Sequence, residues 1–555
     1  MADYQDPNLV NPWGLATLGT SPFWIGNNGT GTSTLYGTTG SPVALTVTIP
    51  VPGGGSGGAV NGVIGNTTTA FAVASGKPAS FLFCTEDGTV SGWNSPVNPA
   101  AAIIMVDNSK SNAVFKGCVT GGTSASPVLY VTDFHNGLVD MFDGNFNPIA
   151  NTKAFVDSSI PAGFAPFGIA SFGGNIYVTY AQQDSARHDD VAGAGNGYVD
   201  VFDAGGNLLS RLISKGSLNS PWGMQMAPAT FGQFSGALLV GNFGDGTINA
   251  FDPAKGTQLG TLMDPTGHPL TIPGLWGLLF GNGGSGGDKS TLYFTAGIPG
   301  PYGEPVESHG LFGSIQAPPS FTASSVVNAA SFQPSLAPNT WASIVGGGLS
   351  VTSRSWAATD FSGNKLPTAI QGVSVTVNGA PAYVSFVSPS QVDFLIPANA
   401  AAGNAQIQVI NNGQVSAAAN VTLISTAPAF FWFTGNKYIA STHANGMPTG
   451  PVSLVTGVTT PVQPGETIVL YANGFGVTSP SAPNGTIVTS ALLLPIQPAV
   501  TIGGVPATVT FAGLIDSGLY QINVTVPASV PAGDAAVIAT IAGQQSQANA
   551  FLSIQ

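Results

Sequence analysis

The sequence predicts an all-β protein, and three features of its 555 residues support this fold class. Only 7% of the residues are charged whereas 43% are hydrophobic, so apolar cores can form although charged helical surfaces are scarce. Gly contributes 75 residues and Pro 42, which is typical of short strands joined by tight turns. The third feature is internal repetition, because six units of one kind precede two of another.

The N-terminal repeat opens with a P-[WF]-G motif and an apolar residue, and it closes on an aromatic-Asp pair. Its most complete copy has Pro221-Trp222-Gly223-Met224, the strand Ala237-Leu238-Leu239-Val240-Gly241, the turn Asn242-Phe243-Gly244-Asp245-Gly246, and a strand ending at Phe251-Asp252. The opening motif recurs as Pro12-Trp13-Gly14-Leu15, Pro166-Phe167-Gly168-Ile169 and Leu275-Trp276-Gly277-Leu278, and the second copy lacks its Trp.

Six such units of about 40 to 50 residues, each able to form about four strands, indicate a six-bladed β-propeller over residues 1–316. A four-stranded sheet cannot bury both of its faces alone, whereas radial packing against its neighbours does so. We expect the Trp and Phe of the opening motif to wedge between neighbouring blades.

A linker is expected at residues 317–324, which begin Ala317-Pro318-Pro319. Two related units follow, at 325–428 and 429–555. They share the patterns Val375-Thr-Val-Asn-Gly-Ala-Pro-Ala382 with Val500-Thr-Ile-Gly-Gly-Val-Pro-Ala507, and Gln391-Val-Asp-Phe-Leu-Ile-Pro397 with Gln521-Ile-Asn-Val-Thr-Val-Pro527. Apolar and polar residues alternate at period two between Gly, Pro and Asn breaks, so both units are predicted to be immunoglobulin-like β-sandwiches.

Several of these runs resemble known families. The repeats resemble NHL-type propellers, and residues 8–316 are more closely similar to a family of uncharacterised bacterial secreted propeller proteins, through runs such as Asp189-Asp-Val-Ala-Gly193 and Leu239-Val-Gly-Asn-Phe-Gly-Asp245. Tyr471-Ala-Asn-Gly-Phe475 and the Gly-x-Pro-Ala turns resemble IPT/TIG domains, and the pair looks like a C-terminal module of exported acidobacterial proteins. The resemblance implies spacing, presentation or attachment for this module, and it brings no activity to the propeller.

The net charge of the chain limits the classes of molecule that it can bind, and its N-terminal sequence and apolar segments bear on its location. The net charge of −13 repels phosphate backbones, so nucleic acid is excluded, while divalent cations and neutral polymers stay compatible. We expect no transmembrane segment, because no stretch of about 20 apolar residues exists. The composition favours an exported bacterial protein, secreted or at the cell surface, whose signal has been removed, since Met1-Ala2-Asp3-Tyr4 lacks a leader pattern. Cys84 and Cys118 lie in successive repeats and could either pair or stay as buried thiols.

The loops between the second and third strands of each blade should emerge on one face, and they concentrate acidic residues. Nine acidic residues fall in these loops: Glu86, Asp87, Asp133, Asp184, Asp189, Asp190, Asp245, Glu304 and Glu307. His135, His188 and His309 lie in the same loops. Oxygen ligands converging from several loops suit a divalent cation, Ca²⁺ before others, and no organic cofactor is expected.

Six-bladed lactonases and gluconolactonases hold one divalent ion at such a mouth with Glu, Asn and Asp. That analogy of fold implies Glu86, Asp133, Asn136, Asp190 and Asn242 as metal ligands. His188, Asp189, Asp190 and His309 are the catalytic candidates, because carboxylate and imidazole together serve general acid–base chemistry. The alternative for Asp and Asn is a structural role, since tight β-turns demand these residues.

Two functions follow. The first is an extracellular binding or presentation protein, whose acidic loop face recognises a polysaccharide, a surface protein, a small polar ligand or a divalent cation, with the sandwiches as a stalk. The alternative is a metal-dependent hydrolase or lactonase at the propeller mouth. The sequence contains no Gly-x-Ser-x-Gly elbow on a strand-to-helix turn, no HExxH motif, no phosphate loop and no dinucleotide fingerprint, which favours the first function, and whether the protein is an enzyme stays open.

Overall fold

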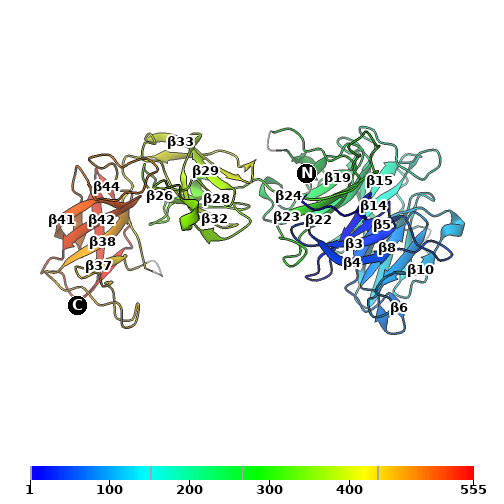
Figure 1. Ribbon diagram of the computed structural model, residues 1–555, viewed down its shortest axis with the longest axis horizontal. Helices are drawn as coiled ribbons and strands as arrows, with labels where there is room; N and C mark the ends of the chain where they lie inside the picture. The colour runs from blue at the N-terminus through cyan, green and yellow to red at the C-terminus, as the bar shows by residue number, and fades with distance from the viewer. Residues whose placement is uncertain (1–2, 151–152, 265–266, 434–436) are drawn as a thin grey trace. The chain divides into compact units, whose positions relative to one another are not determined.

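The computed structural model describes residues 3–150, 153–264, 267–433 and 437–555. The chain forms two compact units, Met1–Ala317 and Pro318–Gln555 (Figure 1). Within the described residues the only helices are four short 3-10 turns, at Ser109–Ser111, Gly232–Phe234, Ala323–Ser325 and Ala358–Asp360, so the all-β prediction is confirmed.

The first unit contains six sheets of three or four antiparallel strands within its described residues, besides the β6–β7 hairpin (Ala72–Ala74, Lys77–Pro78). The sheets are β1 (Pro12–Ala16), β2 (Phe23–Asn27), β3 (Thr32–Tyr36) and β4 (Pro42–Thr48); β5 (Val60–Gly65), β8 (Phe81–Thr85), β9 (Thr89–Trp93) and β10 (Ile103–Asp107); β11 (Phe115–Thr123), β12 (Ser126–Asp133) and β13 (Leu138–Asp143); β14 (Phe164–Phe172), β15 (Asn175–Gln182), β16 (Tyr198–Phe202) and β17 (Leu208–Ser214); β18 (Pro221–Met226), β19 (Leu238–Asn242), β20 (Ile248–Phe251) and β21 (Gln258–Thr261); and β22 (Leu275–Phe280), β23 (Thr291–Ala296) and β24 (Leu311–Gln316).

The first strand of each sheet contacts the first strand of the next, and β22 contacts β1, so the six strands form a closed cycle. Each of them carries a register irregularity at the opening motif, for example between Pro12 and Leu15 and between Pro221 and Met224. This closed arrangement of small sheets is that of a β-propeller.

A glycine makes each of these close approaches feasible. A Cβ on Gly168 would lie 2.1 Å from the carbonyl oxygen of Trp222, and one on Gly223 would lie 2.3 Å from that of Trp276. A Cβ on Gly277 would lie 2.6 Å from the carbonyl oxygen of Trp13, which returns to the first sheet. At these three positions glycine is therefore required, because the backbone of the neighbouring sheet occupies the place of a side chain.

The residue before each of these glycines is termed here an axial residue. The six axial residues are Trp13, Asn61, Lys116, Phe167, Trp222 and Trp276. The four aromatic ones contact one another: the rings of Trp13 and Trp276 stack at 3.3 Å, and Trp222 meets both edge-on at 5.8 Å. The expectation that these rings wedge between blades is therefore wrong, because the bulges turn them into one shared cluster.

The second unit contains two β-sandwich cores. The first has sheets β25 (Val326–Asn328), β26 (Trp341–Val345), β32 (Gln391–Leu395), β31 (Tyr383–Val387) and β27 (Arg354–Ser355), and β28 (Ala369–Ile370), β29 (Val373–Val377), β30 (Ala380–Pro381), β33 (Gly403–Asn411), β34 (Gln414–Val415) and β35 (Ala419–Leu423). The second is built from β36 (Ala429–Phe430), β37 (Ser441–His443), β38 (Thr467–Asn473), β39 (Leu492–Leu493), β40 (Ala499–Ile502), β41 (Val505–Asp516), β42 (Leu519–Thr525), β43 (Gly533–Ile541), β44 (Gln544–Gln545) and β45 (Phe551–Ile554). The finer boundaries at 316, 324 and 428 stay a prediction.

Candidate functional site

The most unusual side chain in the first unit is the buried axial Lys116, which is 1% exposed. Its Nζ is paired with Glu86 and lies 3.3 Å from Oδ1 of Asp189. The ammonium also lies 5.2 Å from the ring of Trp13 and 5.9 Å from that of Phe134, above the axial aromatic cluster. A cation is rarely buried this deeply unless it is paired, and here two carboxylates from separate loops provide the partners.

The charges of this group shift one another's ionisation. Burial lowers the pKa of Lys116, but the charges of Glu86 and Asp189 outweigh that effect, and its pKa is raised above the ordinary value. Burial acts to raise the pKa of Asp189, yet Lys116 and His188 bring it below the ordinary range. Lysine and carboxylate thus each hold the other in its charged form. We call Asn28, Glu86, Lys116, His188 and Asp189 the mouth cluster.

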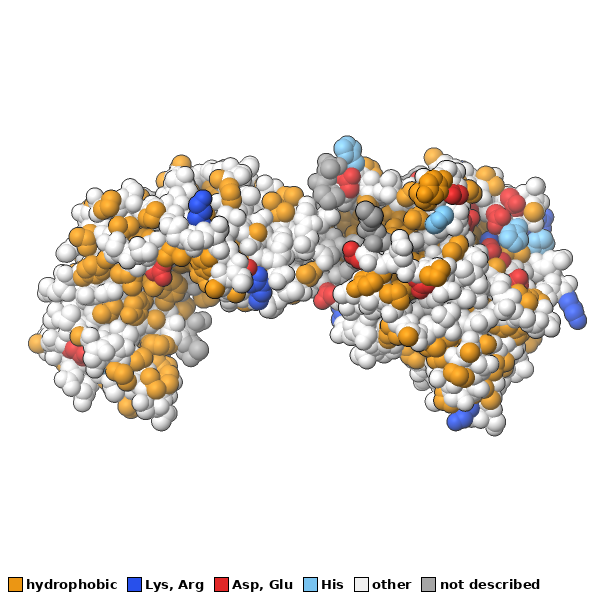
Figure 2. Space-filling view, viewed as in Figure 1, with side chains coloured by type: hydrophobic (Ala, Val, Ile, Leu, Met, Phe, Trp, Pro, Cys, Tyr) orange, Lys and Arg blue, Asp and Glu red, His pale blue; other side chains and the backbone are white. Residues whose placement is uncertain are grey.

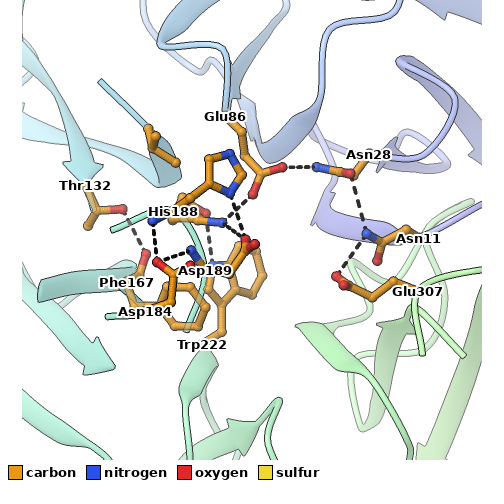
Figure 3. Close-up of polar contacts among 12 residues, drawn as sticks. Asn11, Asn28, Glu86, Thr132, Phe167, Asp184, His188, Asp189, Trp222 and Glu307 are labelled. Carbon is orange, nitrogen blue, oxygen red and sulfur yellow. Dashed lines mark hydrogen bonds and ion pairs between the residues drawn. The ribbon is translucent and has the colours of Figure 1, made fainter. Parts of the chain in front are cut away.

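A chain of amides extends the mouth cluster toward a further carboxylate. Asn28 donates to Oε2 of Glu86 at 2.9 Å, and Asn11 donates to Asn28 at 3.5 Å and to Oε1 of Glu307 at 3.0 Å (Figure 3). The indole N–H of Trp276 donates to Oδ1 of Asn11 at 3.1 Å, and this bond fixes the orientation of the Asn11 side-chain amide. Burial raises the pKa of Glu307 to about 7, and the negative charge of Glu86 adds to this effect.

Of the five predicted metal ligands, Glu86 is the one that belongs to the mouth cluster. Glu86, His188 and Asp189 offer ligand atoms within 4.8 Å of one another, the one group of this kind among the described residues. The ammonium of Lys116 already contacts two of the three, so a divalent cation there would face a fixed like charge. The carboxylates of Glu86 and Asp189 are therefore arranged around the ammonium group of the Lys116 side chain, and this arrangement does not favour Ca²⁺.

Three of the predicted ligands, Asp133, Asn136 and Asn242, make hydrogen bonds within the protein. Oδ1 of Asp133 accepts from the amides of Val114 and Asn136, and Oδ2 accepts from the side chain of Asn136 at 2.7 Å. Asn242 is fully buried, donates to the carbonyl of Ser217 at 2.7 Å and accepts from the amide of Asn219 at 3.1 Å. The oxygens of Asp133 and Asn242 thus already accept from backbone amides, and Asp133 does not belong to the group formed by Glu86, His188 and Asp189, so the five-residue ligand set stays a prediction.

The other predicted site residues divide between two places. His188 Nδ1 lies 2.9 Å from Oδ1 of Asp189, within the mouth cluster. Asp190 follows Asp189 in the chain, and burial raises the pKa of its carboxyl group more than the neighbouring Ser220 and Lys116 lower it. His309 instead lines a separate cavity of about 700 Å³ with Asp6 and Tyr36, so it does not join the other catalytic candidates.

Sequence reasoning missed two polar residues, Lys116 and Asn61. Asn61 is fully buried, and neither its Oδ1 nor its Nδ2 has a partner among the described residues. The sequence did contain a signal for both residues: each precedes the repeated glycine, at the position where the other copies have Trp or Phe. A polar residue at an axial position, where the other copies have an aromatic ring, therefore indicates a part of the axis that is not filled by hydrophobic packing alone.

Cys84 and Cys118 are free thiols in this structure. Their Sγ atoms both border Gly62, whose Cβ would lie 2.3 Å from the first and 2.6 Å from the second. Burial, followed by contact with Cys84, raises the pKa of the Cys118 thiol. The two thiols are thus neighbours between the second and third sheets.

Charged side chains gather over part of the first unit, whereas the visible face of the second shows few of them (Figure 2). Of 25 acidic residues, 20 precede position 317 and 5 follow it. In the part of the chain that the structure describes, no helix has the length and apolarity needed to cross a membrane.

Comparison with known proteins identifies an IPT/TIG domain at residues 358–424. The chain is 36% identical over 287 residues to uncharacterized protein R648 of Acanthamoeba polyphaga mimivirus, covering 50% of this chain and 70% of that protein. It is 33% identical over 307 residues to uncharacterized protein L690 of the same virus, covering 53% and 79%.

Among solved structures, streptogramin B lyase is 10% identical with a TM-score of 0.34, covering 56% of this chain and 96% of its own. A chain of the nidogen/laminin complex is 12% identical with a TM-score of 0.32, covering 49% and 86%.

Fold and sequence together define the class: an all-β protein with a β-propeller and an IPT/TIG immunoglobulin-like domain. Within that class, the chain belongs to the family of the two mimivirus proteins. These relatives are viral, whereas the sequence resemblance pointed to bacterial proteins, so a bacterial origin stays a prediction.

Proposed function

We propose that this protein is a non-catalytic extracellular binding and presentation protein, in which a six-bladed propeller binds a polar ligand at the mouth cluster and the sandwiches act as a stalk. The observation that carries the proposal is the ion pairing of Lys116 with Glu86 and Asp189. This lysine supplies the positive charge that a catalytic metal would otherwise bring, so the site offers fixed donors and acceptors.

The exposure of the mouth cluster supports recognition from solvent. Asp189 and His188 have side chains 67% and 47% exposed, whereas Lys116 beneath them is 1% exposed. A ligand with hydroxyl or amide groups would meet these outer side chains, while the lysine and the amides of Asn11 and Asn28 hold the carboxylates in place. Secretion or display at a cell surface belongs to this proposal.

Binding is tested by titrating the full chain with soluble polysaccharides and candidate surface proteins, followed by Asp189→Asn. Asp189→Asn keeps the shape of an exposed side chain, and Glu86 still pairs Lys116, so folding should be retained while binding weakens at least about tenfold, equivalent to about 1.4 kcal/mol. Asp252→Asn is the matched control, because that carboxylate accepts from its own turn at Ala254 and Lys255. Unchanged affinity in Asp189→Asn would refute binding at the mouth.

The second function, a metal-dependent hydrolase or lactonase, is favoured by one observation, the proximity of Glu86, His188 and Asp189. It requires Lys116 to leave two of those ligands when metal binds. Elemental analysis of the purified chain, before and after dialysis against EDTA, separates the two functions. We expect no stoichiometric divalent metal and no change in Tm with EDTA; bound metal, with lactone or ester turnover lost in His188→Ala, would establish the hydrolase instead.

A further inference from the structure

A second candidate site lies within the Pro318–Gln555 unit and includes none of the acidic loops of the first unit. A cleft of about 820 Å³ opens over the outer face of the sheet β25-β26-β32-β31-β27. This volume falls in the range of small-molecule binding sites. One side is the first sandwich, and Phe431, Ile487 and Leu519 of the following sandwich form the other.

The strand alternation explains why the floor of the cleft is mixed in chemistry. On β32, Val392 and Phe394 point into the sandwich core, which directs Gln391 and Asp393 to the outer face. Trp341 on β26 stands on this same outer face, in register with Leu395. Trp341, Trp356 and Phe361 pack at this face against the buried Leu366, Tyr383 and Leu395, so the cleft has an apolar floor beside its polar residues.

Aromatic rings form the apolar part of the cleft and remain partly exposed. The rings of Trp341 and Trp356 lie 5.6 Å apart at 80°, and Trp356 lies 5.0 Å from Phe361. Trp341 is fixed because its indole N–H donates to the carbonyl of Ser517 at 2.8 Å. Trp356 is anchored by its amide, which donates to the carbonyl of Ser385 at 2.8 Å. Exposed apolar area held this rigidly is typical of a binding surface.

The polar part is oriented just as firmly. Oδ1 of Asp393 accepts from the hydroxyl of Ser343 at 2.6 Å and from Nε2 of Gln391 at 2.8 Å. Asp516 also lines the cleft, and none of its lining residues, all of them described, is Lys, Arg or His. Two carboxylates without a cation repel anionic ligands and accept hydrogen bonds from hydroxyl groups.

The two sandwiches that form the cleft are joined by hydrogen bonds. The amide of Trp341 donates to Oδ1 of Asn473 at 3.0 Å, and Nδ2 of Asn473 donates back to the Trp341 carbonyl at 2.8 Å. The amide of Ile487 donates to the Asn364 carbonyl at 2.8 Å. The cleft is thus preformed, which lowers the ordering cost of binding.

We infer that this cleft binds a neutral oligosaccharide. The apolar C–H face of a sugar ring would stack on Trp356 and Trp341, and its hydroxyls would donate to Asp393 and accept from Gln391. An uncharged sugar can stack on the aromatic residues and form hydrogen bonds with the polar residues of the cleft. The negative charges of uronates and sulfated sugars would instead be repelled by the two carboxylates, with no cation in the cleft to pair with them. This inference is independent of the function proposed for the propeller mouth.

The test is calorimetric titration of the full chain with cellohexaose, xylohexaose, mannohexaose and maltohexaose, and with hexagalacturonate as the anionic probe. We expect at least one neutral hexasaccharide to bind and the hexagalacturonate not to. Trp356→Ala should weaken that binding at least tenfold, and Asp393→Asn several-fold; the second variant keeps the shape of the side chain if the first disturbs folding.

The chain contains its own matched control. In the second sandwich, Nε2 of Gln521 donates to Oδ1 of Asn523 at 2.8 Å, a bond that corresponds to the one from Gln391 to Asp393 but lies outside the cleft, with Asn in place of Asp. Asn523→Ala should leave the affinity for the neutral hexasaccharides unchanged, because Asn523 does not line the cleft. Absence of binding by every neutral probe, equal loss in Asn523→Ala, retention in Trp356→Ala, or binding of peptides in place of sugars would each overturn the inference.

Discussion

At the scale of single residues, the first unit is organised around a lysine that replaces an aromatic ring. Trp13, Phe167, Trp222 and Trp276 pack with one another on the axis, whereas Lys116 extends from the equivalent position to Glu86 and Asp189. A buried ion pair contributes little net stability when intact, but loss of one partner leaves a charge buried without compensation.

Lys116→Met should therefore destabilise the first unit by about 3 to 5 kcal/mol, because Glu86 would remain largely buried without its cation. Urea unfolding measures this change. Lys215→Met, at an exposed lysine, is the control and should stay within about 0.5 kcal/mol. The double variant Lys116→Met with Glu86→Gln should recover part of the loss, and no recovery would contradict the pairing.

The pH dependence of the unfolding free energy should reveal the titration of the Glu307 carboxyl group. Its pKa of about 7 in the folded chain lies above the ordinary 4.5, so the folded state holds a proton that the unfolded state has released. This contribution is fully present below about pH 4.5 and is lost as pH rises through about 7. Glu307→Gln should flatten the decline in stability over this interval by about 1 to 2 kcal/mol, after allowance for solvent screening.

Denaturant unfolding at several pH values between 4.5 and 7.5 provides the measurement. Asp190 and Asp200 also have raised pKa values, so the comparison is the difference between variant and parent. Parallel curves for the two proteins would show that Glu307 is not the group responsible.

At the scale of elements, a bulge and a glycine at the start of each first strand close the propeller. The bulge directs the axial side chain inward, and the glycine lets the next sheet's backbone approach. The same local device is repeated around the ring, which explains why a short motif recurs in a chain whose repeats otherwise differ.

Gly168→Ala should test this device. Its Cβ would lie 2.1 Å from the Trp222 carbonyl oxygen, which belongs to backbone and cannot rotate away. We expect a loss of about 2 kcal/mol or more in unfolding free energy. Gly37→Ala is the control, because its nearest atom is the Ser41 hydroxyl at 3.2 Å, a side chain that can move. Equal effects of the two substitutions in urea unfolding would argue against sheet-to-sheet closure at Gly168.

At the scale of the whole molecule, each compact unit has its own hydrophobic clusters. Leu275, Phe294 and Ala317 belong to one at the end of the first unit, and Val326 and Leu336 belong to another at the start of the second. A unit with its own core is expected to fold as a unit.

Fragments 1–317 and 318–555 should therefore each fold alone, and calorimetry of the full chain should show transitions that match those of the fragments. EDTA should leave both transitions unchanged if no metal supports the fold. A single transition of the full chain, with unfolded fragments, would show that the units depend on each other for stability.

The sequence by itself determined the all-β class, the two kinds of repeat and the IPT/TIG domain, because strand alternation, turn glycines and repeated motifs are local properties of the chain. The tertiary structure alone decided which acidic residues meet: Glu86 and Asp189 are 30 and 73 residues from Lys116, while Asp133 accepts a hydrogen bond within its own turn. The physical reason is that a turn is fixed by neighbours in sequence, whereas a buried charge is fixed by whichever distant loops the closed ring of sheets brings over it.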